Sequence, residues 1–326
     1  MGLNLSKCAG LGLLAAVLVC PGAARSQTFP SEPIRIVVPF PAGGNTDVTA
    51  RLIAPIMQEV LGQPVVIENR AGAGGMIGAS GVMSSKPDGH TLMMGTNSTV
   101  SVGPNIFSNW PYDPIKGVTP ISLIQTVPFA LIVRADSPIK SLQELVKLAK
   151  EKPGEITQAH AGLGTSNHLV SELFQLRTGA KFLLVPYKGS AAAMNDLLGG
   201  QVQTLFDQAS TTVSQVEGGK VRALGVTSAK RMAALPDVPT FAEAGVRDFE
   251  VLNVSGLVGP AGMDQSVVTK LHDATLKALA DPKVKAGFSK LGVQVVGSSP
   301  EEFATFIKED LDLWARVVKE AKVNVR

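Results

Sequence analysis

The stretch PFPAGGNTDVTARLIAPIM, residues 39–57, directly follows an apolar run at residues 34–38. The apolar run predicts a strand, and the prolines after it end pairing within a sheet. Gly43 and Gly44 give the backbone freedom to turn, and a helix is expected over residues 46–61. The amide groups of such a helix start carry partial positive charge and can hold a carboxylate or phosphate without a basic side chain. An ordinary glycine turn between a strand and a helix explains these residues equally well.

Residues 1–26 predict a secretory signal peptide. Lys7 precedes an apolar stretch at residues 8–20, and Ala24 and Ser26 suit the −3 and −1 positions of a cleavage site. The apolar stretch is shorter than the ~20 residues that a membrane-spanning helix needs. We therefore expect a mature chain of 300 residues in the periplasm, which is long enough for two domains.

Composition excludes several classes of site. Both cysteines lie in the predicted signal peptide, so the mature chain would have no disulfide, thiol nucleophile or thiolate ligand. The four histidines show no metal-binding spacing, so no metal and no cofactor is expected. After removal of the signal peptide, 28 basic residues would stand against 27 acidic ones, a balance that does not suggest nucleic-acid or membrane-surface binding.

Short β-rich runs alternate with helical stretches along the mature chain. Strands are predicted at residues 34–38, 65–68, 91–95, 129–134, 156–161, 182–186, 204–206, 222–227, 251–258 and 293–296, and the helical patterns between them include residues 46–61, 141–150, 166–179, 191–198 and 301–321. Such alternation predicts an α/β fold with parallel or mixed sheets covered by helices. Many of these strands are continuous apolar runs, as expected when both faces of a sheet are buried.

The stretch AHAGLGTSNHLVSELF, residues 159–174, repeats the pattern of residues 39–57. A predicted strand runs into Gly162 and Gly164, and hydroxyl and amide side chains follow at a helix start. In open α/β sheets ligands lie at the carboxyl ends of strands, where both loops would be. Since neither loop contains lysine or arginine, we expect them to hold one carboxylate jointly through N–H and hydroxyl groups.

Motifs spread over the whole mature chain carry a family resemblance. They include PFPAGGN at residues 39–45, PDGHTL at 87–92, GTSNHL at 164–169, PYKG at 186–189 and LPDVPT at 235–240. Together and in this order they resemble the extracytoplasmic substrate-binding proteins of tripartite tricarboxylate transporters, the Bug proteins. Each motif is short, but the ordered set is highly specific.

The resemblance implies a two-lobed periplasmic binding fold of the type II Venus-flytrap kind, with a mixed sheet in each lobe and a hinged cleft. It implies that the chain crosses between the lobes twice, with residues 27–125 and 236–326 in lobe 1 and residues 126–235 in lobe 2. Such proteins capture a small organic acid and pass it to an integral-membrane permease. We accordingly expect a monomeric receptor without catalytic activity, whose partners are a carboxylate ligand and permease subunits.

The family's two ligand loops correspond to residues 40–46 and 162–168 of this chain. Thr96 and Asn97 follow a predicted strand, where their side chains could bind a ligand or simply form a turn. Asp207 could accept a hydrogen bond from a ligand or cap the next helix. The candidate ligand-binding residues are Phe40, Ala42, Gly43, Gly44, Asn45, Thr96, Asn97, Gly162, Gly164, Thr165, Ser166, His168 and Asp207.

Two enzyme interpretations compete with a receptor. Ser166 and His168 suggest an exported serine hydrolase, but their local order is not G-x-S-x-G, and side chains two apart on a helix point in different directions. Residues 72–78 read G-x-G-x-x-x-G rather than the dinucleotide-binding G-x-G-x-x-G. Ligand-dependent thermal stabilisation without turnover would separate a receptor from the hydrolase.

Overall fold

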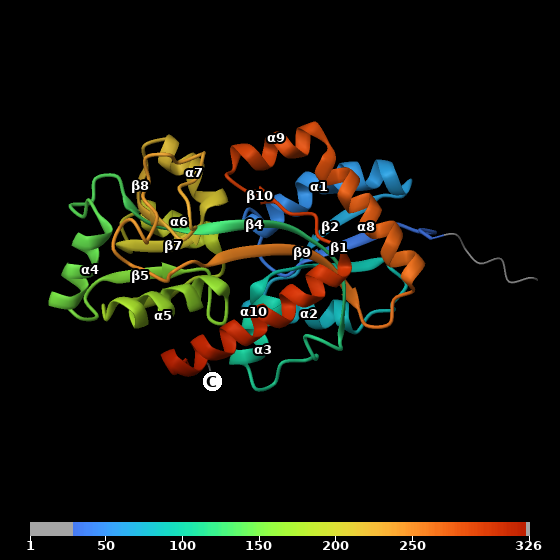
Figure 1. The fold of residues 1–326 in the computed structure, drawn as a ribbon, viewed down its shortest axis with the longest axis horizontal. Coiled ribbons are helices and arrows are strands. Elements are labelled where there is room, and N and C mark those ends of the chain that lie inside the picture. The colour runs from blue at the N-terminus through green and yellow to red at the C-terminus, as the bar shows by residue number, and fades with distance from the viewer. Residues whose placement is uncertain (1–28, 324–326) are drawn as a thin grey trace, which may run out of the picture.

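The computed structural model describes residues 29–323 as two lobes that share one long strand (Figure 1), and the predicted signal peptide lies outside these residues. The strands are β1 (Ile34–Val38), β2 (Val65–Asn69), β3 (Thr91–Gly95), β4 (Val118–Arg134), β5 (Thr157–His160), β6 (Leu183–Pro186), β7 (Thr204–Gln208), β8 (Val221–Val226), β9 (Leu252–Pro260) and β10 (Gln294–Val295). The helices are α1 (Asn45–Leu61), α2 (Met76–Met83), α3 (Gly103–Ile106), α4 (Leu142–Glu151), α5 (Ser166–Thr178), α6 (Ser190–Leu198), α7 (Ala209–Glu217), α8 (Gln265–Ala280), α9 (Pro282–Lys290) and α10 (Pro300–Ala321), with the 3₁₀ turn η1 (Ala73–Gly75) and the π-helical turn η2 (Ser98–Val102). The predicted α/β alternation is confirmed.

The sheet of the first lobe is mixed. β1 pairs in parallel with β2 and β3, and β9 pairs antiparallel with β3 and β4. Successive side chains of a strand point to opposite faces, so Ile36 and Val38 join one core cluster and Val37 joins another. Helices α1, α8 and α9 lie on one side of this lobe, and α2, α3 and α10 lie on the other (Figure 1).

The sheet of the second lobe is also mixed. β7 pairs in parallel with β5 and antiparallel with β4, β6 extends the sheet beyond β5, and β8 pairs with β4. Phe174, Phe206, Phe241 and Phe249 are all buried and pack ring against ring on one face of this sheet. A mixed sheet in each lobe is what the family resemblance implied.

Strand β4 belongs to both sheets. Residues 118–128 pair with β9 in the first lobe, and residues 129–134 pair with β7 and β8 in the second. The sequence predicted only the second part, because Pro120 and Pro128 argue against a strand. In the structure the pairing register shifts directly after Pro120, and the strand continues through both prolines.

The chain returns to the first lobe at the start of β9. Before it, the Phe241 N–H donates to the Val226 carbonyl, and the rings of Phe241 and Phe249 stack with their centroids 5.0 Å apart. These contacts belong to the second lobe. We therefore propose a lobe boundary near Val251, rather than the boundary at residues 235–236 that the resemblance implied.

Helix α10 spans the two lobes. It begins with a capping box, in which Ser299 accepts from the Glu302 N–H and Glu302 accepts from the Ser299 N–H. Phe303 then packs in the core of the first lobe, whereas Trp314 packs in that of the second. Within residues 29–323, each helix is either too short or too polar to cross a membrane.

Candidate functional site

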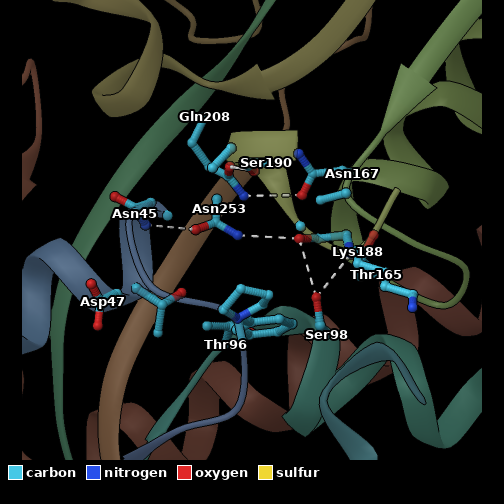
Figure 2. A pocket seen from close by; sticks show the side chains of 18 of the residues that line it. Asn45, Asp47, Thr96, Ser98, Thr165, Asn167, Lys188, Ser190, Gln208 and Asn253 are labelled. Atoms are coloured by element: carbon cyan, nitrogen blue, oxygen red, sulfur yellow. Dashed lines mark hydrogen bonds between the residues drawn. The ribbon is translucent and has the colours of Figure 1, made fainter. Parts of the chain in front are cut away.

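A cavity of about 50 Å³ lies between the two lobes (Figure 2). Hydroxyl and amide side chains form much of its wall, and Asp47 and Lys188 are the ionisable residues among those that line it in the described part of the chain. The lining residues are Phe40, Pro41, Ala42, Gly44, Asn45, Thr46, Asp47, Thr96, Ser98, Ala161, Thr165, Ser166, Asn167, Lys188, Gly189, Ser190, Ala191, Gln208 and Asn253. Both lobes contribute to it, as the two glycine loops predicted.

Asp47 fastens the loop that precedes α1. Its carboxylate accepts hydrogen bonds from the Gly43 N–H at 2.9 Å, from Arg51 Nε at 3.0 Å and from Asn69 Nδ2 at 2.9 Å. Burial raises the pKa of Asp47, but the hydrogen bonds from Arg51, Gly43 and Asn69 outweigh burial and hold the pKa below its usual value. Asp47 is therefore an ionised support of the loop, and Gly43 bonds to it rather than lining the cavity.

Helix α1 presents its first turn to the cavity. Its N-cap is Gly44, so among the described residues no side chain caps this helix start. Asn45 and Thr46 of the first turn line the cavity. A Cβ atom at Gly44 would meet no heavy atom of residues 29–323 within 4 Å, because Gly44 faces open space. The partial positive charge of this helix start is thus available to an anion.

Helix α6 gives a second such start, which sequence reasoning missed. Its N-cap is Gly189, at φ +114°, and within residues 29–323 no side chain caps it. Gly189, Ser190 and Ala191 line the cavity. A Cβ atom at Gly189 would lie 3.1 Å from Pro41 Cγ of the other lobe, so glycine permits this close approach. The sequence does contain this signal, because the strand predicted at residues 182–186 is followed by Gly189 and by the helix predicted at residues 191–198.

The start of helix α5 is already bonded within the protein. Thr165 Oγ1 accepts from the His168 N–H at 3.3 Å, and the Ser166 N–H donates to Ser98 Oγ at 2.9 Å. Ser98 belongs to the first lobe, so this bond crosses the cleft. The sequence predicted that this helix start would hold the carboxylate, but two of its first three amide groups have protein partners.

Gly162 and Gly164 shape the second loop from outside this cavity. Both have positive φ, +134° and +74°. A Cβ atom at Gly164 would clash with the ring of Phe107, which belongs to the first lobe. Glycine at this point therefore permits the two lobes to come together.

Amide side chains connect the two lobes through the cavity. Asn45 Nδ2 donates to Asn253 Oδ1 at 3.1 Å, and Asn253 Nδ2 donates to Ser166 Oγ at 3.1 Å (Figure 2). Asn45 Oδ1 accepts from Ser210 Oγ at 2.7 Å. Asn253 comes from β9, and the sequence around it has no glycine loop or helix start that would have identified it.

Thr96 and Asn97 have different roles, although they are neighbours. Thr96 lines the cavity, is 1% exposed, and its Oγ1 has no hydrogen-bond partner in residues 29–323. Asn97 faces away, since its Nδ2 donates to Asp310 Oδ2 at 2.9 Å and its Oδ1 accepts from the Val254 N–H at 2.9 Å. Thr96 is therefore a residue of the cavity wall whose buried hydroxyl has no partner in the described part of the chain, and Asn97 holds the turn in place.

Asp207 lies beneath the cavity and supports residues that line it. It accepts hydrogen bonds from Ser190 Oγ at 2.6 Å, from Asn167 Nδ2 at 3.2 Å and from Thr211 Oγ1 at 2.7 Å. Burial raises the pKa of Asp207, and these donors counteract part of that rise. Asp207 thus fixes the orientation of Ser190 and Asn167, instead of capping α7, whose N-cap is Gln208.

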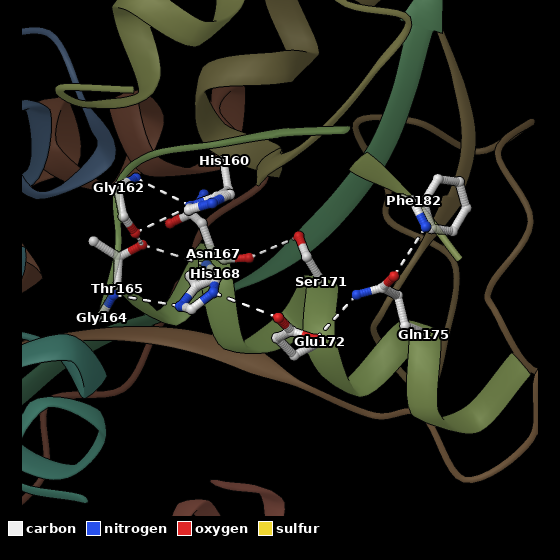
Figure 3. Close-up of polar contacts among 10 residues, drawn as sticks. All are labelled: His160, Gly162, Gly164, Thr165, Asn167, His168, Ser171, Glu172, Gln175 and Phe182. Carbon is white, nitrogen blue, oxygen red and sulfur yellow. Dashed lines mark hydrogen bonds and ion pairs between the residues drawn. The ribbon is translucent and has the colours of Figure 1, made fainter. Parts of the chain in front are cut away.

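His160 and His168 stack behind the second loop, with ring centroids 4.7 Å apart (Figure 3). The Gly164 N–H donates to His168 Nδ1 at 3.4 Å, and His168 Nε2 lies 3.6 Å from a Glu172 oxygen. Burial, together with the neighbouring His168, lowers the pKa of His160 to about 3. In the described part of the chain no hydrogen bond joins Ser166 to His168, so the geometry gives the hydrolase alternative no support.

The structure separates the predicted site residues into two groups. Phe40, Ala42, Gly44, Asn45, Thr96, Thr165 and Ser166 line the cavity between the lobes. Gly43, Asn97, Gly162, Gly164, His168 and Asp207 do not line it and support the residues that do.

A larger outer cavity, of about 540 Å³, adjoins the inner one. Residues 71–75 of the first lobe and residues 161–163 and 186–189 of the second form most of its wall. The two cavities share Phe40, Pro41, Ala161, Thr165, Lys188 and Gly189. The outer cavity is therefore part of the same cleft.

Comparison with known proteins agrees with this architecture. Residues 49–323 match the family described as tripartite tricarboxylate transporter family receptor. Protein BugT of Bordetella pertussis is 36% identical over 317 residues, which cover 97% of each chain. The structure of the periplasmic binding protein BugD superposes with a TM-score of 0.87 at 39% identity, covering 91% of this chain and 100% of that one. MatC from Rhodopseudomonas palustris, solved with bound malate, gives 0.86 at 35% identity, covering 89% and 100%. The chain belongs to the tripartite tricarboxylate transporter receptor family.

Proposed function

We propose that this protein is a periplasmic receptor that binds a small organic acid in the inner cavity and delivers it to an integral-membrane permease. The malate bound to MatC supports the ligand class, and the description of the family as a transporter receptor supports a permease as partner. The observation that carries the proposal is Thr96 Oγ1, a hydroxyl buried at the cavity without a partner among the described residues. A buried polar group without a partner is unfavourable, and a ligand oxygen would satisfy it.

The proposed carboxylate position is defined by α1 and α6. Both helix starts lack a side-chain cap in the described residues, and the first turns of both line the cavity. A helix start stabilises an exposed anion by ~0.3–1 kcal/mol, and a partly buried one by up to ~2 kcal/mol. Two helix starts and several charge-assisted hydrogen bonds are enough for micromolar binding, about −8 kcal/mol. This arrangement replaces α5 by α6 in the site that the sequence predicted.

Binding requires the cleft to open and close. The bond between the Ser166 N–H and Ser98 Oγ and the approach of Gly189 to Pro41 both join one lobe to the other. A ligand enclosed by these contacts can enter only when they separate. Hinge closure around a ligand is the usual motion of two-lobed receptors.

Isothermal titration of the mature protein with malate and other small mono-, di- and tricarboxylates tests the proposal. Thr96→Val keeps the shape of the side chain and should weaken binding by about 0.5–1.5 kcal/mol, the contribution of one hydrogen bond. Thr275→Val is the matched control, because Thr275 is equally buried in α8 and bonds only to the Leu271 carbonyl. If no organic acid binds, or if Thr275→Val weakens binding as much as Thr96→Val, the proposed site is wrong.

A further inference from the structure

Residues 71–75 form a glycine-rich strap between β2 and α2. Together with Phe40 and Pro41 they are the part of the outer cavity wall that the first lobe supplies among the described residues, and the second lobe supplies the rest. Ala71 and Ala73 are exposed to solvent, so the strap lies at the outer edge of this wall. A molecule that leaves the inner cavity through the outer one therefore passes between the strap and the second lobe.

The backbone of the strap adopts angles that are rare for residues other than glycine. Residues 72–75 all have positive φ, at +139°, +47°, +64° and +100°. Glycine adopts such angles readily, but the second of these residues is Ala73, which is strained there. Strained residues persist only where the surrounding structure holds them, and they cluster at switch regions and ligand clamps. The contacts of the strap therefore show what it does.

One contact holds the strap within the first lobe. A Cβ atom at Gly75 would lie 2.8 Å from Thr99 Cγ2 and 3.3 Å from Phe40 Cζ, so the backbone of Gly75 lies directly against these two side chains. Phe40 lines both cavities. The C-terminal end of the strap therefore rests on a residue of the first ligand loop.

A second contact crosses the cleft. A Cβ atom at Gly74 would lie 3.0 Å from the carbonyl oxygen of Leu163 and 3.4 Å from that of Gly164, so here backbone meets backbone without a side chain between them. Within residues 29–323 no backbone hydrogen bond joins the strap to these two residues. Packing alone makes this contact, which suits a contact that must break and form again. Because its partners belong to different lobes, the contact exists only while the cleft is closed.

We propose that the strap is the gate of the cleft, and that separation of Gly74 from Leu163 and Gly164 sets the rate at which a bound molecule leaves. This assignment rests on the proposed function, since it assumes that a ligand occupies the inner cavity. It goes beyond hinge closure, because it assigns the dissociation rate to one segment of the chain. A weaker contact should raise the dissociation rate constant and leave the association rate constant nearly unchanged, because the open form is the same.

Gly74→Ala tests the gate, because its methyl group would lie between the strap and Leu163. Gly219→Ala is the matched control, since Gly219 has the same φ of +64° and a Cβ atom there would meet no heavy atom of residues 29–323 within 4 Å. Both variants contain a strained alanine, and only Gly74→Ala disturbs the cleft. Both should lose the same amount of unfolding free energy in a denaturant titration.

Stopped-flow mixing with an organic acid that the wild type binds measures the two rate constants. For Gly74→Ala the dissociation rate constant should rise about fivefold or more and the association rate constant should change less than about twofold, as expected when a packed contact is overfilled. Gly219→Ala should match the wild type in both. An unchanged dissociation rate constant in Gly74→Ala, or an equal rise in the two variants, would overturn the gate alone. If no organic acid binds the wild type, the proposed function fails, and the gate with it.

A reducible cross-link tests the gate directly, because the predicted mature chain contains no cysteine. Ala73→Cys and Leu163→Cys, combined in one variant, place thiols at two exposed positions beside the contact. A short bismaleimide with a central disulfide should join them, and the joined protein should retain a bound acid through gel filtration until the linker is reduced. Ala73→Cys combined with Leu183→Cys is the control, since Leu183 is equally exposed but lies outside both cavities. This control should release the acid as wild type does. Release of the acid from the joined protein before reduction would overturn the gate.

Discussion

Asn97 Nδ2 donates a hydrogen bond to Asp310 Oδ2 at 2.9 Å, although 213 residues separate the two along the chain. Ser101 Oγ donates to the same oxygen, and Trp314 Nε1 donates to Asp310 Oδ1 at 3.1 Å. Hydrogen bonds to α10 therefore hold the turn η2 in place. This turn includes Ser98, which accepts from the Ser166 N–H of the second lobe.

Asp310→Asn should destabilise the protein. The three partners of Asp310 are all donors, so an amide NH₂ at this position would face another donor and leave a buried group unsatisfied. We expect a loss of about 1–3 kcal/mol in the free energy of unfolding, measured by denaturant titration. Asp312→Asn, on the exposed face of the same helix, should change it by less than about 0.5 kcal/mol. Equal effects of the two substitutions would contradict this role of Asp310.

Gly44→Val should abolish carboxylate binding without unfolding the protein. Gly44 has φ −82°, which valine adopts without strain, and its Cβ would point into space that is open within residues 29–323. The valine would therefore occupy the position of the ligand. Calorimetric titration with an organic acid that the wild type binds should show no binding for Gly44→Val and intermediate affinity for Gly44→Ala, and thermal denaturation should show both variants folded. Unchanged affinity in Gly44→Val would place the carboxylate elsewhere.

Gly164→Ala should prevent full closure of the lobes, because its Cβ would clash with the ring of Phe107. Gly179→Ala is the control, since Gly179 is the C-cap of α5, the helix that follows Gly164, with a similar φ of +69°, and a Cβ atom there would lie no closer than 3.8 Å from its nearest neighbour, Lys150 Cε. Small-angle scattering with a saturating concentration of an organic acid that the wild type binds should show a smaller radius of gyration for wild type and Gly179→Ala. The radius of Gly164→Ala should stay at its ligand-free value, and a normal decrease would refute the proposed contact.

His160 should make stability depend on pH. Its pKa is about 3 in the folded protein and near 6.5 when unfolded, so between these values the unfolded chain binds a proton that the folded chain does not. Stability should therefore fall as pH decreases from about 6.5, by up to about 1.4 kcal/mol per pH unit for this group. His168, which stacks on His160, and Glu172, which faces His168, are retained in His160→Gln. The difference in unfolding free energy between wild type and His160→Gln should shrink from pH 7 to pH 5, and a constant difference would contradict the prediction.

Several elements of the fold could be predicted from the sequence because their signals were local. Glycine turns, capping residues and apolar periodicity are properties of neighbouring residues, and the predicted bounds of β1, β3, α1 and α10 lie within one residue of the observed ones. The first half of β4 was missed because pairing with β9 stabilises a segment whose prolines argue against a strand.

The site could be predicted only in part, for a similar reason. The loop at residues 40–46 was identified by its glycines, and most of it lines the cavity. Thr165 accepts from the His168 N–H of its own helix, which a glycine pattern does not reveal. Asn253 reaches the cavity because β9 lies beside β3 and β4, and Lys188 because β6 ends beside the cleft. The positions of these two side chains depend on pairing between strands that are far apart in the sequence. A short stretch of sequence therefore does not predict them.

The shared strand β4 has a consequence for how the protein unfolds. Because its 17 residues supply a paired strand to each sheet, neither lobe has a complete sheet if the chain is divided at the hinge. Loss of β4 from one lobe would remove its support from the other, so the two halves should melt together. A single cooperative transition in calorimetry, and failure of either half to fold when produced alone, are the expected signs of this coupling.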